Sequence, residues 1–208
     1  MSTPRQTSDP SFWDARYAGP AFAFGRAPNA VVAAEADRLG DGARVLDLGA
    51  GEGRNAVFLA RRGHDVTALD VATAELDRAT AWAAAEGLRL GVEEADLSGW
   101  SAPEAAYDGV VCTFVHLLSH ERPAMWAAIE RALRPGGVLL GEWFTPDHLR
   151  LGGPGPSRPD RLVSAGEVRD ALRGGRLHVC REVERGLDEG PFLQGRAATV
   201  QVVFERAG

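Results

Sequence analysis

The stretch from residue 44 to residue 56 places a short apolar strand directly before a glycine loop and the beginning of a helix. The strand is carried by Val45, Leu46 and Leu48, and the loop by Gly49, Gly51 and Gly53. Glycine adopts positive φ at little cost and lets a ligand approach bare backbone. The free N–H groups of the following helix face whatever lies in such a loop. With Asp47 before the glycines and Asp70 at the end of the next apolar run, this pattern predicts a site for a nucleoside cofactor.

Composition narrows the class of protein around this site. The chain has 208 residues, a net charge of −6, and 23 basic residues that are all arginine. The absence of lysine excludes Schiff-base chemistry and a Walker-type phosphate lysine, and the negative charge argues against nucleic acid as a partner. The first residues are polar, and the longest apolar run is too short for a membrane span. We therefore expect a cytoplasmic protein that does not bind membranes.

Apolar strand-like runs alternate with helix-like segments along most of the chain, which predicts a parallel sheet with helices on both faces. Strands are expected at 44–48, 65–69, 89–95, 107–114 and 138–144, and helices at 29–39, 55–62, 72–86, 122–133 and 164–172. Residues 177–185 and 197–204 are expected to form a final hairpin. We expect one α/β domain, with 1–40 as an aromatic segment and helix that act as a lid, and 41–208 as the main body.

The spacing of the glycines distinguishes between two classes of cofactor. A dinucleotide site carries Gly-x-Gly-x-x-Gly, whereas here the third glycine comes one position early and Arg54 stands in its place. Asp47 would repel a pyrophosphate but suits a ligand with a cationic amine and a sulfonium. Asp70 is placed to accept from ribose hydroxyls, and Asp96, at the next strand end, from an adenine amine. These acids at successive strand ends predict S-adenosylmethionine.

The chain resembles the class I S-adenosylmethionine-dependent methyltransferases over 45–59, Asp70-Val71, Ala95-Asp96-Leu97, 107–114 and 133–137. A narrower resemblance, to small bacterial methyltransferases of the tellurite-resistance-like group, is carried by segments 12–17, 24–29, 142–146 and 188–197. It implies a Rossmann-like seven-stranded sheet whose last strand is antiparallel, with the N-terminal aromatic segment folded over the cofactor.

The motifs that carry the resemblance also indicate which residues contact the cofactor. The expected contacts are Arg16, Tyr17, Asp47, Gly49, Ala50, Gly51, Arg54, Asn55, Asp70, Val71, Ala95, Asp96, Leu97 and Thr113. No metal is expected, because the two cysteines and five histidines lack ligand spacing. Two alternatives remain open, namely a catalytically silent cofactor-binding protein and a nicotinamide-dependent oxidoreductase.

The methyl acceptor is expected to be a small molecule, in a protein that is a monomer or a homodimer. Methyl transfer is an in-line displacement that mainly needs alignment and exclusion of water. A soft nucleophile such as a thiol or a selenium or tellurium oxyanion needs little or no base, whereas a hydroxyl or amine needs one. His116, His120 and Glu142 follow or end the fourth and fifth strands and are the candidates beside the acceptor. Residues 146–160 are either a flap that closes over the substrate or a surface loop.

Overall fold

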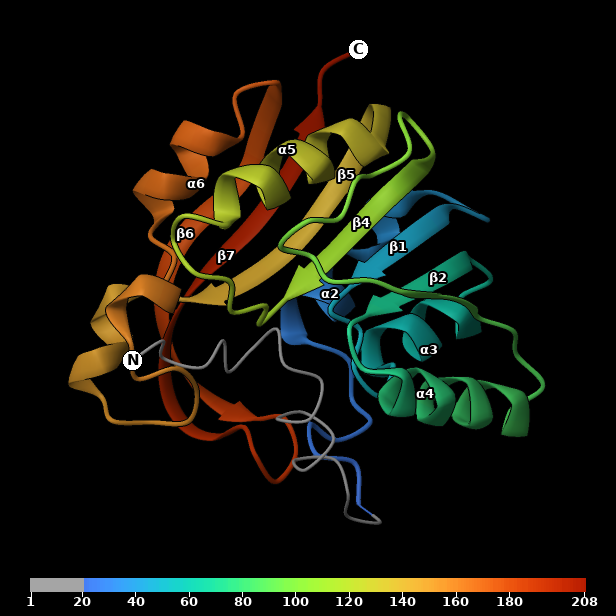
Figure 1. Ribbon diagram of the computed structural model, residues 1–208, viewed down its shortest axis with the longest axis horizontal. Helices are drawn as coiled ribbons and strands as arrows, with labels where there is room; N and C mark the ends of the chain where they lie inside the picture. The colour runs from blue at the N-terminus through green and yellow to red at the C-terminus, as the bar shows by residue number, and fades with distance from the viewer. Residues whose placement is uncertain (1–20) are drawn as a thin grey trace.

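The computed structural model describes residues 21–208 and shows a seven-stranded sheet with the order β3-β2-β1-β4-β5-β7-β6 (Figure 1). The strands are β1 (Arg44–Leu48), β2 (Asp65–Asp70), β3 (Gly91–Glu94), β4 (Tyr107–Thr113), β5 (Leu133–Phe144), β6 (Gly175–Asp188) and β7 (Gln194–Arg206). The pairs among β1 to β5 are parallel, while β7 runs antiparallel to both β5 and β6. The predicted α/β class and the antiparallel last strand are confirmed.

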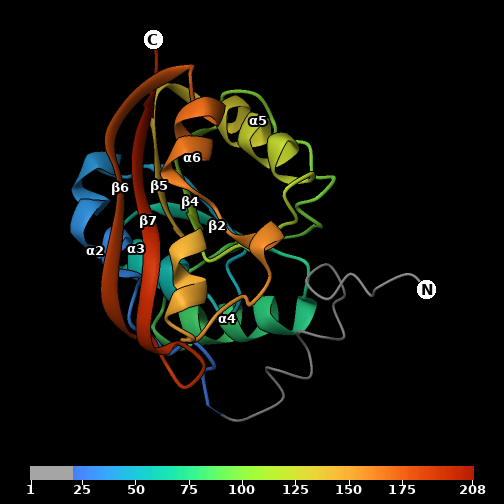
Figure 2. The ribbon, with the colours of Figure 1, turned by 90° about the vertical axis from the view of Figure 1, so that its left-hand side faces the viewer.

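Helices cover both faces of the sheet, as the alternating pattern predicted. One face carries α2 (Ala30–Glu35), α3 (Arg54–Arg61) and α4 (Thr73–Ala85), and the other carries α5 (Arg122–Ala132) and α6 (Ala165–Ala171). In the edge view, α2 and α3 lie on one side of the sheet and α5 and α6 on the other (Figure 2). Neighbouring strand residues such as Val45 and Leu46 enter opposite cores, because side chains alternate across a strand.

The helix expected over 29–39 packs on the sheet, which corrects its assignment to a lid. It consists of α2 and a 3-10 turn over Ala36–Leu39. Asn29 caps α2 by accepting from the Val31 N–H, as Asn does at helix N-termini. Val32 is fully buried in the core beside strand residues such as Val203. Residues 1–20, which make up most of the rest of the predicted lid, lie outside the described part of the chain.

Strand β5 begins earlier than the apolar pattern indicates. Tyr107 of β4 pairs with Leu133, whereas Gly109 pairs with Val138, so the segment between the two β5 residues bulges out of register. Residues 134–137, Arg-Pro-Gly-Gly, form this bulge, and Gly136 takes a φ of 77° there. Strand β3 is shorter than expected, at four residues on the edge of the sheet.

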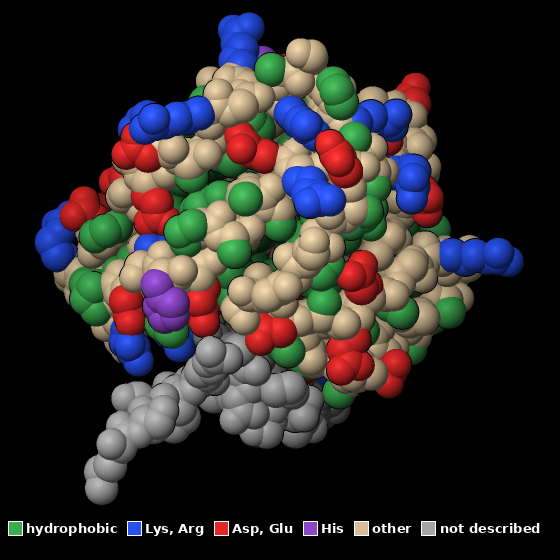
Figure 3. Space-filling view, turned by 45° about the horizontal axis from the view of Figure 1, so that its top comes forward, with side chains coloured by type: hydrophobic (Ala, Val, Ile, Leu, Met, Phe, Trp, Pro, Cys, Tyr) green, Lys and Arg blue, Asp and Glu red, His purple; other side chains and the backbone are tan. Residues whose placement is uncertain are grey.

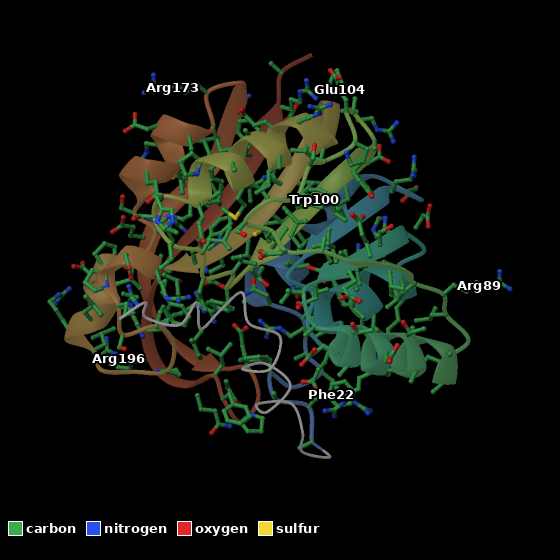
Figure 4. All side chains as sticks on the ribbon, in the orientation of Figure 1. Phe22, Arg89, Trp100, Glu104, Arg173 and Arg196 are labelled. Carbon is green, nitrogen blue, oxygen red and sulfur yellow. The ribbon has the colours of Figure 1, made fainter. Side chains whose placement is uncertain are left out.

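The connection from β3 to β4 crosses the α5 face without a helix. Trp100 and Ala102 of this connection pack against the core on that face, and the Trp100 indole N–H donates to Glu93 at 2.7 Å. In Figure 4, Trp100 lies over the sheet whereas Arg89 extends away from the body. An aromatic side chain thus covers apolar surface that a helix would otherwise bury.

The long antiparallel pair β6–β7 places its tip at the functional edge of the sheet. Because β7 is antiparallel to β5 and to β6, β6 runs in the direction of the parallel strands. Its carboxyl end and the tip at 189–193 therefore lie at the edge where the parallel strands end, which is the ligand edge of open α/β sheets.

The outer surface mixes charges of both signs. Figure 3 shows acidic and basic side chains interspersed on one face, with apolar side chains between them. No helix within residues 21–208 has both the length and the apolar content needed to cross a bilayer.

Candidate cofactor and acceptor site

A cavity of about 320 Å³ opens at the carboxyl ends of the parallel strands. One half of its wall is formed by the glycine loop and the ends of β2 and β3. The other half is formed by the segment after β4, the loop at 155–158 and the hairpin tip. Eleven of the predicted cofactor residues line it, namely Gly49, Ala50, Gly51, Arg54, Asn55, Asp70, Val71, Ala95, Asp96, Leu97 and Thr113. Most of the residues predicted to contact a cofactor therefore lie together on one cavity wall.

The glycine loop requires glycine for both backbone and space. Gly49, Gly51 and Gly53 have φ values of 66°, 53° and 82°, which lie in the left-handed region that other residues rarely adopt. A Cβ at Gly49 would lie 2.6 Å from the Cγ2 of Val115, and one at Gly53 would lie 2.6 Å from the Cβ of Ala79. The loop therefore holds bare backbone against the cavity, as close approach of a cofactor requires.

Asp70 ends β2 and holds the glycine loop in place. Its Oδ2 accepts from the Gly51 N–H at 2.8 Å, and its Oδ1 accepts from the Ala72 N–H at 3.2 Å. Burial raises the pKa of Asp70, and these backbone donors oppose that shift. Each carboxylate oxygen has a second lone pair, so a diol in the cavity can still be bound. This arrangement fits the ribose of S-adenosylmethionine.

Asp96 lies beyond the end of β3. Its Oδ1 accepts from the Ser98 N–H at 2.9 Å, which fixes the carboxylate in a turn on the cavity wall. The neighbouring Ala95 is tied to β2, because its N–H donates to the Asp70 carbonyl. A carboxylate held at this position suits the exocyclic amine of an adenine.

Asp47 lies beneath the glycine loop rather than on the cavity wall, which corrects its assignment as a direct contact. Its side chain is 1% exposed, and within the described residues its Oδ2 has no hydrogen-bond partner. Burial raises its pKa from 3.8 to about 7, with the positive charge of Arg54 opposing the shift. Asp47 therefore supplies a buried carboxyl below the site, and its burial favours the protonated form.

Arg54 and Asn55 begin α3 and connect the loop to distant segments. The Asn55 side chain accepts from the Asn29 N–H at 2.9 Å and donates to the Thr113 hydroxyl at 3.0 Å. Arg54 lies over the Phe114 ring at 5.9 Å and pairs with Glu189 of the hairpin tip at 2.6 Å. Arg54, which stands where a dinucleotide motif has its third glycine, therefore forms an ion pair with the hairpin tip on the other side of the site.

Of the acceptor-side candidates, the structure places His116 on the cavity wall and Glu142 away from it. The His116 ring lies 5.6 Å from the Phe144 ring. Glu142 is fully buried within β5, where it accepts from Arg185, Asn29 and Thr199. Burial alone would raise the pKa of Glu142, but these donors outweigh it and lower the pKa. Its carboxylate is committed to this network, so the assignment beside the acceptor is corrected.

His120 is exposed and does not line the cavity. Arg16 and Tyr17 lie outside the described residues. The 155–158 loop lies within the segment that the sequence offered as a flap or a surface loop. The lining residues that the sequence did not single out are Gly25, Glu52, residues 114, 115 and 117, Phe192 and Leu193. Segments 24–29 and 188–197 carried the family resemblance, and this was the available signal that they approach the site.

Residues 22–25 reach the cavity because they are held between the glycine loop and the hairpin. The Ala23 N–H donates to Glu52 at 2.6 Å, and the Phe192 N–H donates to the Ala23 carbonyl at 3.1 Å. Gly25 and Gly190 approach so closely that a Cβ on Gly190 would lie 2.1 Å from the Gly25 nitrogen. Three segments far apart in sequence thus meet at the cavity mouth.

Comparison with known proteins agrees with this geometry. Residues 45–137 match the family described as a methyltransferase domain. The structure resembles that of TehB from Haemophilus influenzae, with a TM-score of 0.70 and 20% identity, covering 95% of this chain and 66% of that one. It also resembles a protein solved in work on conversion of a disulfide bond into a thioacetal group during echinomycin biosynthesis, with a TM-score of 0.76 and 25% identity, covering 95% and 92%.

Among curated sequences, 2-heptyl-1-hydroxyquinolin-4(1H)-one methyltransferase of Mycobacteroides abscessus is 32% identical over 146 residues, covering 65% of this chain and 63% of its own length. The chain spans only 33% and 41% of the length of the first curated relatives that it matches. Residues 45–137 therefore carry the match to a methyltransferase domain, and the sheet order and overall fold are similar to those of TehB. The cofactor predicted from the sequence, S-adenosylmethionine, is the cofactor of the class I methyltransferases.

Proposed function

We propose that this protein transfers the methyl group of S-adenosylmethionine to a small molecule that has an apolar body and a soft nucleophilic atom. The observation that carries the proposal is one cavity with two different walls. The glycine loop with Asp70 and Asp96 forms one wall, and an aromatic surface forms the other. Such a cavity brings a polar nucleoside and an apolar acceptor together in a site shielded from water.

The cofactor wall would act by binding and orientation. Asp70 would hold the ribose, Asp96 the adenine amine, and the bare backbone of Gly49 and Gly51 would support the amino-acid part. S-adenosylmethionine supplies an electrophilic methyl group when bound. We further propose that the segment containing Arg16 and Tyr17 closes over the cofactor, because residues 22–25 already reach the cavity mouth.

The acceptor wall favours a molecule with an apolar body. Phe24, Phe114, Phe192 and Leu193 line it, and the Phe24 and Phe192 rings lie 6.4 Å apart. Pockets of this kind bind through apolar contact, with a few polar groups setting orientation. The loop at 155–158 adds Pro156 and Ser157 to the same wall, which supports the proposal that the 146–160 segment covers the substrate.

A soft acceptor atom fits the scarcity of bases on this wall. Among the described residues on it, His116 is the side chain whose ordinary pKa lies near neutrality. The structural relative that acts in echinomycin biosynthesis works on a disulfide, and this supports sulfur as an acceptor. The quinolone methyltransferase relative supports an aromatic body. An aryl thiol combines the two features, an alkyl thiol has only the sulfur, and selenite and tellurite are smaller soft acceptors.

Formation of S-adenosylhomocysteine from S-adenosylmethionine tests the proposal. Purified protein is incubated with aromatic thiols, aliphatic thiols, selenite, tellurite and N-hydroxyquinolones, at pH 7 and pH 9. We expect turnover with an aromatic thiol, and a His116→Asn variant that retains most of its rate at pH 9, where the thiolate forms without a base. Cofactor binding without turnover on any acceptor would instead support the silent cofactor-binding alternative.

A further inference from the structure

The hairpin tip carries a buried carboxylate that pairs with Arg54, a residue of the cavity wall. Glu189 follows directly after β6, and its N–H donates to the Leu193 carbonyl, which closes a tight turn. Its side chain is only 7% exposed. This residue belongs to the 188–197 segment that carried the family resemblance, and the methyl-transfer chemistry leaves its role unexplained.

Glu189 is part of a chain of alternating charges that runs from the cavity wall into the sheet. Its Oε2 lies 2.6 Å from Arg54 Nη1, and its Oε1 lies 2.5 Å from Arg185 Nη2. Arg185 in turn pairs with Glu142 at 2.6 Å. Two arginines and two glutamates thus alternate, and their formal charges cancel.

The cavity meets this chain at Arg54. Arg54 lines the wall and is 7% exposed, so its charge is poorly screened by water and acts strongly on a ligand. Without Glu189 the guanidinium of Arg54 would lose the ion-pair partner that the described residues give it, and the buried Asp47 below the loop would be its remaining acidic neighbour. The charge of Arg54 would then repel a sulfonium and attract a phosphate, although the site lacks the dinucleotide glycine spacing.

We propose that Glu189 sets the electrostatic potential of the cofactor cavity by neutralising the charge of Arg54, so that Arg54 does not repel the cationic sulfonium of S-adenosylmethionine, whereas the neutral thioether of S-adenosylhomocysteine would not experience this repulsion. This inference rests on the proposed function. It makes Glu189 a positioning residue that acts through Arg54. The functional consequence is that loss of Glu189 would strengthen product inhibition, because only the substrate carries the charge that an unpaired Arg54 repels.

The ratio of the dissociation constants for the two ligands isolates this effect. The ligands share the adenosine and amino-acid groups, so contacts made to both cancel in the ratio and the sulfonium charge remains. Isothermal titration with S-adenosylmethionine and with S-adenosylhomocysteine is performed on the wild type, Glu189→Gln, Arg54→Gln and the double variant. Glu184→Gln is the matched control, because Glu184 lies on the same hairpin and pairs with exposed Arg196.

In Glu189→Gln we expect affinity for S-adenosylmethionine to fall relative to S-adenosylhomocysteine by about three- to tenfold, the size of one nearby, partly screened charge. In Arg54→Gln the ratio should shift in the opposite direction, and in the double variant it should return close to the wild-type value. Glu184→Gln should leave it unchanged. Thermal unfolding of each variant identifies losses of stability, which do not produce ratio shifts of opposite sign.

Two results overturn the inference, and they differ from failure of the proposed function. If wild type binds both ligands and Glu189→Gln leaves their ratio unchanged, the inference fails alone. If Glu189→Gln does not fold, the Arg54→Gln variant replaces it. An unchanged ratio of the two dissociation constants in Arg54→Gln would then show that the inference is wrong. If wild type binds neither ligand, the proposed function itself fails.

Discussion

At the scale of single residues, the region under the glycine loop combines burial with charge. Asp47 is fully enclosed, with Arg54 and Asp70 as its charged neighbours. Cys112 on the adjacent strand is also enclosed, and burial raises the pKa of its thiol so that it stays protonated. Water cannot solvate an ionised Asp47 here, so the free energy of unfolding depends on whether Asp47 is protonated.

Replacing Asp47 with Asn should therefore change how stability depends on pH. The folded pKa of about 7 is raised above the unfolded value of 3.8, so the stability that Asp47 contributes is complete below pH 4 and lost as pH rises to 7. About three pKa units correspond to about 4 kcal/mol. From pH 4 to pH 8 the free energy of unfolding of Asp47→Asn should rise relative to wild type by up to this amount.

Urea unfolding of both proteins at several pH values, without cofactor, measures this difference. The expected result is a gap that widens between pH 4 and pH 7 and is constant above. A gap that does not change with pH would show that Asp47 is ionised at its ordinary pKa in the folded protein.

A second prediction concerns the space at Gly49. In Gly49→Ala the backbone φ of 66° is unfavourable for alanine, and the new Cβ would also lie 2.6 Å from the Cγ2 of Val115. In Gly63→Ala the backbone φ of 87° is similarly unfavourable, but no atom lies within 4 Å of the new Cβ. Backbone strain alone costs about 1 kcal/mol, and overpacking adds about 1 to 3 kcal/mol. Gly49→Ala should thus lose more unfolding free energy than Gly63→Ala, and only Gly49→Ala should weaken S-adenosylhomocysteine binding. Equal effects on stability and binding would contradict a tight loop.

At the scale of elements, Arg122 joins α5 to α6 and to the acceptor side of the cavity. Its guanidinium forms a fork with Glu167, at 2.6 Å and 2.8 Å, and its Nη1 donates to the carbonyls of Asp160 and Leu117. Arg122 is almost fully buried. One planar side chain therefore fixes the start of α5, the side of α6 and the turn before it.

Arg122→Lys tests this connection, because lysine keeps the charge but cannot reproduce the fork. We expect a loss of about 1 to 3 kcal/mol in unfolding free energy from the lost charged hydrogen bonds. Arg173→Lys is the control, since Arg173 pairs with Asp170 at an exposed i,i+3 position and such pairs contribute about 0 to 1 kcal/mol. Similar urea midpoints for the two variants would show that the fork does not stabilise the α5–α6 contact.

The elements that the sequence predicted best are those specified by short-range signals. Strand β1 was predicted with its observed bounds, and β2 to within one residue at its end, because apolar runs and turn residues mark them. The bulge at the start of β5 was missed, since Pro135 and Gly136 resemble a turn and only pairing with β4 reveals the strand. Helix α2 was assigned to the lid because its periodic apolar face does not say which surface it covers.

In the site, too, the residues in short sequence motifs could be predicted, whereas those brought in by tertiary packing could not. The glycine loop, Asp70 and Asp96 could be predicted because the cofactor half is built from strand ends with motifs close in sequence. Phe192 could not, because it enters the cavity only after residues 22–25 pack between the loop and the hairpin. Glu142 was misplaced because a polar residue near a strand end gives no signal of a buried network.

At the scale of the whole molecule, the sheet order explains why one cavity has two walls. The cofactor wall lies over β1, β2 and β3, and the acceptor wall lies over β4 and the β6–β7 tip. Because β6 runs in the direction of the parallel strands, the hairpin tip lies at the carboxyl edge, where Glu189 pairs with Arg54 and the Phe192 N–H donates to the Ala23 carbonyl. The methyl donor and acceptor would thus be held by opposite ends of one sheet.

Isothermal titration with S-adenosylhomocysteine, with NAD as the comparison ligand, tests the central claim most directly. We expect micromolar binding of S-adenosylhomocysteine, no comparable binding of NAD, and at least about a tenfold loss in Asp70→Asn, equivalent to about 1.4 kcal/mol. Asp65→Asn, at the exposed start of the same strand, should bind as wild type does. Absence of S-adenosylhomocysteine binding, or a preference for NAD, would contradict the assignment of this cavity to S-adenosylmethionine.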